Sequence, residues 1–112
     1  MIILDSTLKS LEVKLAGAIT ANQLVWMISY VDLDATFTLS TASEGDGVTN
    51  GVTAVSMVAA PASNHTRQIK FLSVYNADTV AATVTIQINN NSTKRIVTAV
   101  TLQTGETLQY AA

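Results

Sequence analysis

The chain has 112 residues, of which 48% are hydrophobic and 12% are charged, and its formal net charge is −2. The high hydrophobic content excludes a disordered chain, and the length fits a single domain that spans residues 1–112. The six basic residues are scattered rather than clustered, and no run of about 18 apolar residues occurs, so we expect neither a nucleic-acid partner nor a membrane segment.

The first third of the chain predicts strands. Residues 1–10 start with an apolar run, which is either a first strand or an N-terminal arm that adds to the sheet of a partner. Residues 11–15 alternate apolar and charged side chains, as a half-buried strand does. Residues 23–33 (QLVWMISYVDL) are rich in β-branched and aromatic side chains and predict a second strand. After a turn at 34–35, residues 36–39 alternate again and predict a short strand.

The middle of the chain mixes turn signals with strands. Residues 40–51 (STASEGDGVTNG) concentrate Gly, Ser, Asn and Asp and predict an exposed loop that ends in an Asn-Gly turn. Residues 53–60 resume as a strand and stop at Pro61. Residues 68–75 alternate imperfectly, with Ile69, either Phe71 or Leu72, and Val74 facing inward.

The last third alternates more regularly. Residues 83–88 place valine and isoleucine on one face and Thr and Gln on the other, and residues 89–92 (NNNS) predict a turn. Strands at 95–102 and 107–110 follow, separated by a turn at 104–106. About eight short strands predict an all-β fold, either a single antiparallel β-sandwich of jelly-roll type or a barrel.

Few residues suggest chemistry. His65 is the only histidine and lies in a polar loop, where a metal site or hydrolytic triad would need further ligands or an oriented base. Asp32 and Asp34 could converge on one side of a strand, and Glu44 and Asp46 lie in a polar loop, but a calcium-binding loop pattern is missing. We therefore predict no enzyme activity, no metal and no cofactor.

The aromatic residues leave several roles open. Trp26 and Tyr30 alternate along one predicted strand and could be core residues, interface anchors or a sugar-stacking platform. Together with the apolar start of the chain they form the candidate interface: Ile2, Ile3, Leu4, Trp26 and Tyr30.

Several phrases resemble small β-rich virion proteins of tailed bacteriophages. They are LEVKLAGAITANQL, TNGVTAVSMVAAPA, RQIKFLSVYNADTVAATVTIQIN and VTLQTGETLQY, which together span nearly the whole chain. The resemblance implies a structural component of the virion without catalytic residues.

Within that implication, capsid decoration is the main expectation. A decoration (cement) protein sits on the capsid surface, binds the major capsid protein and ties neighbouring subunits together, and closed symmetry favours a homotrimer at three-fold positions. A tail or fibre module that touches a host glycan is the alternative. A free carbohydrate-binding domain, with Trp26 and Tyr30 as its stacking surface, is a third.

Overall fold

The computed structural model describes residues 1–112 and confirms the predicted all-β sandwich. It contains no helix, and hence no helix that could span a membrane. One more strand forms than the sequence predicts. The nine strands are β1 (Ile2–Leu4), β2 (Lys9–Leu15), β3 (Val25–Leu33), β4 (Ser43–Val48), β5 (Val55–Val58), β6 (Thr66–Tyr75), β7 (Ala82–Asn90), β8 (Thr93–Leu102) and β9 (Thr107–Ala111).

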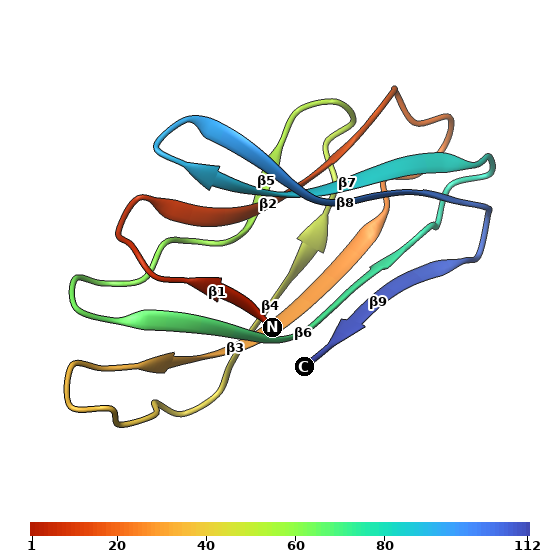
Figure 1. Ribbon diagram of the computed structural model, residues 1–112. Helices are drawn as coiled ribbons and strands as arrows, with labels where there is room; N and C mark the ends of the chain where they lie inside the picture. The colour runs from red at the N-terminus through yellow and green to blue at the C-terminus, as the bar shows by residue number, and fades with distance from the viewer.

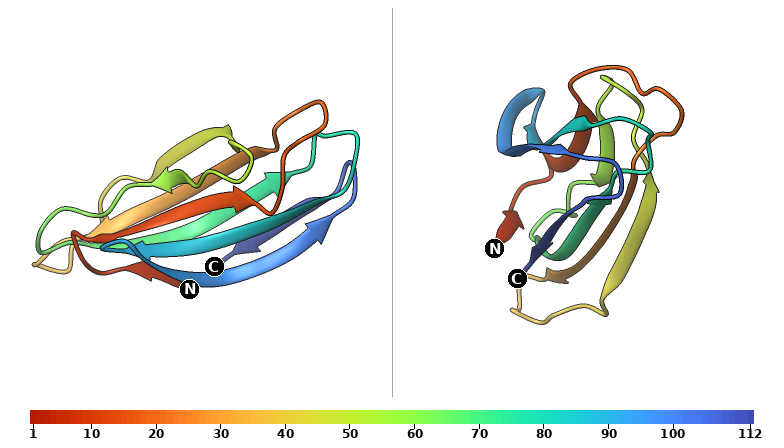
Figure 2. Two further views of the ribbon diagram at one scale, coloured as in Figure 1. Left: turned by 90° about the horizontal axis from the view of Figure 1, so that it is seen from above. Right: turned by 90° about the vertical axis from the view of Figure 1, so that its right-hand side faces the viewer.

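The strands form two antiparallel sheets that pack face to face (Figures 1 and 2). Sheet A has the order β1-β6-β3-β4, and β9 also pairs with β6. Sheet B has the order β5-β2-β7-β8. β1 pairs with residues 67–69 of β6, whereas β9 pairs with residues 71–75, so the two short strands share one edge of sheet A. The molecule is elongated, with extents of 47 × 26 × 18 Å.

The structure shows how residues 1–10, expected to be either a first strand or an N-terminal arm, are folded. β1 pairs with β6 of its own chain and Leu4 is fully buried, so the start of the chain is the first strand of the sandwich and not an arm. Ile2 is half-buried and its N–H donates to the Tyr110 hydroxyl at 2.8 Å, whereas Ile3 is 44% exposed.

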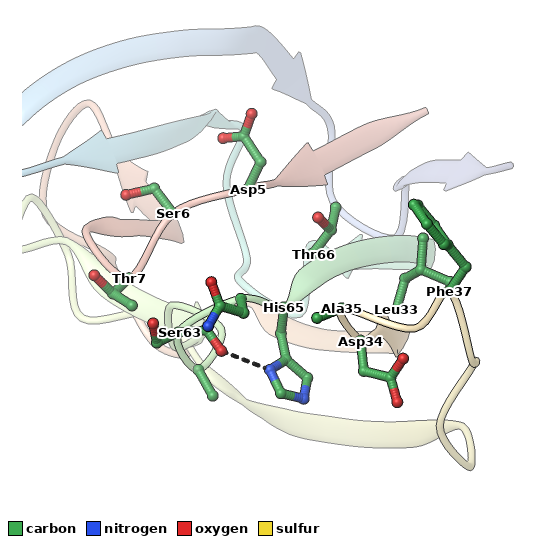
Figure 3. Close-up of a pocket in the computed structure, with 12 residues that line it drawn as sticks. Asp5, Ser6, Thr7, Leu33, Asp34, Ala35, Phe37, Ser63, His65 and Thr66 are labelled. Atoms are coloured by element: carbon green, nitrogen blue, oxygen red, sulfur yellow. Dashed lines mark hydrogen bonds between the residues drawn. The ribbon is translucent and has the colours of Figure 1, made fainter.

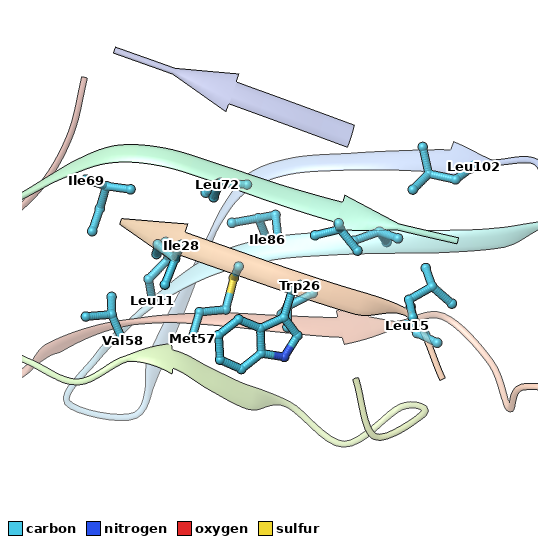
Figure 4. Close-up of a cluster of buried hydrophobic side chains, with 14 of the residues drawn as sticks. Leu11, Leu15, Trp26, Ile28, Met57, Val58, Ile69, Leu72, Ile86 and Leu102 are labelled. Carbon is cyan, nitrogen blue, oxygen red and sulfur yellow. The ribbon is translucent and has the colours of Figure 1, made fainter. Parts of the chain in front are cut away.

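The core lies between the sheets and consists of fifteen buried apolar residues (Figure 4). The predicted inward faces of β2 and β7 supply much of it. The buried residues are Leu4, Leu11, Val13, Leu15, Leu24, Trp26, Ile28, Met57, Val58, Ile69, Leu72, Val74, Val84, Ile86 and Leu102.

A β-bulge explains the imperfect alternation of β6. Ser29 pairs with Phe71 and the next residue, Tyr30, pairs with Ile69, so Lys70 is an extra residue without a partner on β3. The extra residue shifts the side-chain pattern by one position. Ile69 and Leu72 therefore both reach the core, which decides between the two inward candidates in favour of Leu72 over Phe71.

The predicted strand at 36–39 is wrong. Asp34 Oδ1 accepts hydrogen bonds from the N–H groups of Thr36 and Thr38 and from the Thr36 hydroxyl, at 2.7–2.9 Å. Such side-chain bonds to the nearby backbone compete with a strand ladder. The segment instead forms a turn in which Phe37 has a positive φ of 60°.

The predicted loop at 40–51 is also wrong in part, because β4 lies inside it. β4 forms the free edge of sheet A and pairs with β3 from Val25↔Val48 to Tyr30↔Ser43. Its two glycines face inward, where the Trp26 indole lies across the strand: a Cβ at Gly47 would stand 2.6 Å from Cζ2 of Trp26. Glycine here marks a close approach of a ring to a backbone rather than a turn.

Candidate interaction surface

The outer face of sheet A carries exposed apolar side chains in register. Val25 pairs with Val48 on one side and with Tyr75 on the other, which puts these three residues in one row across β4, β3 and β6. Met27 lies in the next row, two residues along β3, and points to the same side. We call Val25, Met27, Val48 and Tyr75 the apolar patch; each is 41–53% exposed.

Two carboxylates border the apolar patch. Glu44 and Asp46 alternate with the glycines of β4 and therefore point outward, and Asp46 lies directly opposite Met27. Neither residue takes part in a salt bridge within the chain. The sequence predicts that these two carboxylates lie together in a loop, whereas the structure places them on the rim of an apolar sheet face.

The outer face of sheet B is polar and internally bonded. Glu12 is only 8% exposed and accepts hydrogen bonds from Gln87, Asn89 and Lys94 at 2.8–3.1 Å. Burial opposes ionisation of Glu12, but these hydrogen bonds outweigh it and hold the pKa of Glu12 below its ordinary value of 4.5. The charged and amide groups around Glu12 are bonded to one another, so the two faces of the sandwich differ in character.

The structure separates the aromatic residues that the sequence put forward for an interface. Trp26 belongs to the core, with 6% of its surface exposed, and its Nε1 has no hydrogen-bond partner. Tyr30 is half-buried under the Arg67 guanidinium, whose Cζ lies 4.5 Å from the ring centroid. Neither ring offers an open face for stacking a sugar.

Asp32 and Asp34 do not converge. Arg67 holds Asp32 in a bidentate ion pair, with Nε–Oδ1 and Nη2–Oδ2 distances of 2.8 and 2.9 Å, and these hydrogen bonds lower the pKa of Asp32. Asp34 organises its own turn, and the N–H of Thr38, followed by the Thr36 hydroxyl, lowers its pKa. Both carboxylates are engaged in structural roles.

His65 lines an open cavity of about 520 Å³ at one end of the sandwich (Figure 3). Its Nδ1 lies 2.9 Å from the carbonyl oxygen of Ser63, as expected of a loop residue. The cavity walls also carry Asp5, Asp34 and the exposed ring of Phe37. No group of three or more His, Cys, Asp or Glu side chains is placed to hold a metal ion.

Sequence reasoning missed the apolar patch because it assigned residues 23–33 by composition and not by face. The run QLVWMISY is apolar at both odd and even positions, which indicates a strand that is covered on both sides. Sheet B covers one side, and nothing in the chain covers the other.

Comparisons with known proteins add no relative: no protein-family model, curated protein or solved structure matches the chain.

Proposed function

We propose that this protein is a structural subunit of a bacteriophage virion, a capsid decoration protein that binds the head surface and ties capsid subunits together. The phage assignment rests on the resemblance of the sequence. The observation that carries the binding role is the apolar patch on the outer face of sheet A, because exposed and contiguous apolar side chains on a rigid sheet are typical of protein–protein contacts.

The patch fits a flat protein surface better than a small ligand. Its four side chains come from three neighbouring strands that are held in register by the sheet, so little conformational entropy is lost when a partner covers them. Tyr75 brings the kind of rigid aromatic area that often dominates interface energetics. The acidic rim of Glu44 and Asp46 favours a partner with basic groups around an apolar centre.

The test uses heads that lack this protein. Purified wild-type protein should co-sediment with such heads, and Met27→Asp or Val48→Asp should weaken binding by about 30-fold or more, because each buries an unpaired charge in the contact. Ile96→Asp is the matched control: Ile96 is also apolar and 68% exposed, but it pairs with Gln87 on the outer side of sheet B. Its binding should stay at the wild-type level.

Location distinguishes the alternatives. Electron microscopy of virions should place the protein on the head surface. A protein found on the tail, or particles that keep intact heads without it but fail to adsorb to cells, would support the tail or fibre role instead. If the patch variants bound heads as tightly as wild type, the apolar patch would not be the surface that contacts the capsid.

A further inference from the structure

The most exposed large hydrophobic side chain of the molecule is held in an unfavourable backbone conformation. Phe37 is 83% exposed and has a φ of 60°, a region that bulky residues rarely adopt. Strained conformations of this kind persist where the surroundings enforce them, and they cluster at binding sites. A phenylalanine ring that lies mostly in water is stabilised when a partner covers it.

The loop that carries Phe37 is firmly built. In addition to the three bonds that Asp34 accepts, the N–H of Phe37 donates to the Asp34 carbonyl at 3.0 Å, and the N–H of Asp34 donates to the Thr38 carbonyl at 3.1 Å. Ser40 closes the base of the loop through bonds to and from the backbone of Asp32, at 2.8 and 2.9 Å. The backbone that carries Phe37 is therefore held in one conformation, so little backbone entropy is lost on binding.

The same chain carries an apolar groove of about 230 Å³ where the two sheets part. It opens between β8, the free edge of sheet B, and the edge of sheet A that β1 and β9 share. Leu72 and Ile86 of the core form its floor. Its walls include Ile2, Val97, Leu108 and Tyr110.

A second β-bulge shapes this groove. Gln87 pairs with Ile96, and the preceding Ile86 pairs with Thr98, so Val97 is an extra residue on β8. Bulges re-aim side chains, and Val97 lines the groove although it is 42% exposed. The edge strand is thus formed so that an apolar wall faces the opening.

We propose that copies of this chain join head to tail, with Phe37 of one copy seated in the groove of the next. The sizes agree, since an apolar cavity of about 150 Å³ is known to hold a benzene molecule. Phe37 does not line the groove of its own chain. The contact therefore joins two molecules.

Charge supports a second copy as the occupant. Asp34, at the base of the Phe37 loop, makes all of its side-chain bonds through Oδ1 and leaves Oδ2 free. Arg95 lies on β8, two residues before Val97, and its side chain has no hydrogen bond or ion pair within the chain. A seated Phe37 loop brings a carboxylate toward the edge that carries this unpaired guanidinium.

A contact of this kind is heterologous, because two different surfaces of the molecule meet. Heterologous contacts produce a ring when the rotation between neighbours closes, and an open chain of subunits when it does not. A closed ring of three would have a mass three times 11.8 kDa. This inference rests on the proposed function, for which three-fold positions of a capsid would favour a homotrimer, but its test uses the purified protein without heads, so the two proposals can fail separately.

The first experiment measures mass by analytical ultracentrifugation. Wild type should associate with increasing concentration. Phe37→Ala should raise the dissociation constant by about 30-fold or more, as loss of a central aromatic anchor does. Leu39→Ala is the matched control, since Leu39 is 57% exposed in the same loop. Its association should equal that of wild type. A wild type that stays monomeric at all concentrations would overturn the proposal.

The second experiment tests the head-to-tail geometry by mixing. Phe37→Ala keeps an intact groove, and Val97→Glu keeps an intact Phe37 but puts a charge at the groove. Each variant alone should be monomeric. Their equimolar mixture should form a 1:1 dimer and nothing larger, because only one of the two junctions is intact. Urea unfolding of both variants verifies that they are folded. A mixture that stays monomeric contradicts the proposed pairing of Phe37 with the groove.

Discussion

At the scale of single residues, one indole ring accounts for a glycine in the edge strand β4. Trp26 points inward from β3 and extends under its neighbour β4, and the inward positions of β4 are Gly45 and Gly47. The outward positions of the same strand are free to carry Glu44, Asp46 and Val48, which form part of the apolar patch and its rim. The need to make room for a core residue therefore shapes the candidate interface on the opposite face.

Gly47→Ala should lower the free energy of unfolding by about 1–3 kcal/mol, because the new methyl group would overlap the Trp26 ring, 2.6 Å from Cζ2. Gly45→Ala is the matched control. A Cβ there meets its nearest atom, Cγ2 of Ile28, at an ordinary 3.5 Å. Because alanine suits a strand better than glycine, this variant should be neutral or stabilised by up to about 1 kcal/mol. Urea unfolding followed by Trp26 fluorescence measures both, and equal stabilities would refute the packing argument.

Asp78 is a residue whose role only the folded structure discloses. It is 1% exposed, and its carboxylate accepts backbone N–H groups from the loop at residues 20–22 and from Thr79. The Thr20 N–H has the largest effect, burial opposes it, and the remaining N–H groups add to it. Together they lower the pKa of Asp78 from 3.8 to about 2.

A lowered pKa makes Asp78 stabilising at neutral pH. The folded state binds its proton less tightly than the unfolded chain does, so its contribution is complete above about pH 4 and is lost as the pH falls through about 2. Asp78→Asn should lower the melting temperature at pH 7 and should reduce the loss of stability between pH 4 and pH 2. Thermal unfolding at a series of pH values measures this, and parallel curves for the two proteins would contradict the assignment.

At the scale of elements, the β7–β8 hairpin shows how a turn prediction becomes a stability prediction. The expected turn at residues 89–92 is confirmed: the loop between β7 and β8 consists of Asn91 and Ser92, which have φ of 49° and 72°. Two positive φ values in a two-residue loop are typical of a type I′ turn, in which Asn-Gly is the preferred pair. Serine is the unfavourable choice at the second position.

Ser92→Gly should therefore raise the free energy of unfolding by about 0.5 kcal/mol, because glycine relieves the left-handed strain but adds freedom to the unfolded chain. The same substitution at Ser43, an exposed residue of β4 whose φ is not positive, should lower it. Chemical denaturation of the two variants gives the comparison. A loss of stability in Ser92→Gly would show that the positive φ of Ser92 does not reduce the stability of the hairpin.

Elements were predictable where a local pattern repeated. The alternation of β2 and β7 and the turns at 89–92 and 104–106 were read from neighbouring residues alone. The failures, at 36–39 and at β4, share a cause: in each, a contact outside the local pattern overrides it. Asp34 bonds to the backbone of the residues that follow it and forms a turn, and Gly47 belongs to a strand in which the Trp26 ring leaves no room for a side chain.

At the scale of the whole molecule, the topology joins strands that are far apart in the sequence. β1 and β9, at the two ends of the chain, both pair with β6, and β2 pairs with β7. The cost of closing such long loops must be met before the pairings stabilise the fold. Only the β7–β8 pair is a tight local hairpin.

This topology predicts slow folding, in the range of milliseconds to seconds, as for other non-local β-sandwiches. Stopped-flow dilution from urea measures it, with the buried Trp26, the only tryptophan, as the probe. Recovery of native fluorescence that is already complete within the mixing time would show that local structure, and not long-range pairing, sets the rate.

The sequence by itself determined the fold class, the absence of long helices, most strand positions and the inward faces of the regular strands, because period-2 patterning and turn chemistry are local properties. Only the tertiary structure decided which face of which sheet stays uncovered, that Trp26 is core, that β1 closes its own sheet, and that Phe37 and an apolar groove lie open on one molecule. These features depend on which distant segments of the chain meet. A local sequence pattern shows that a strand has two apolar faces, but it does not show whether another segment covers each of them.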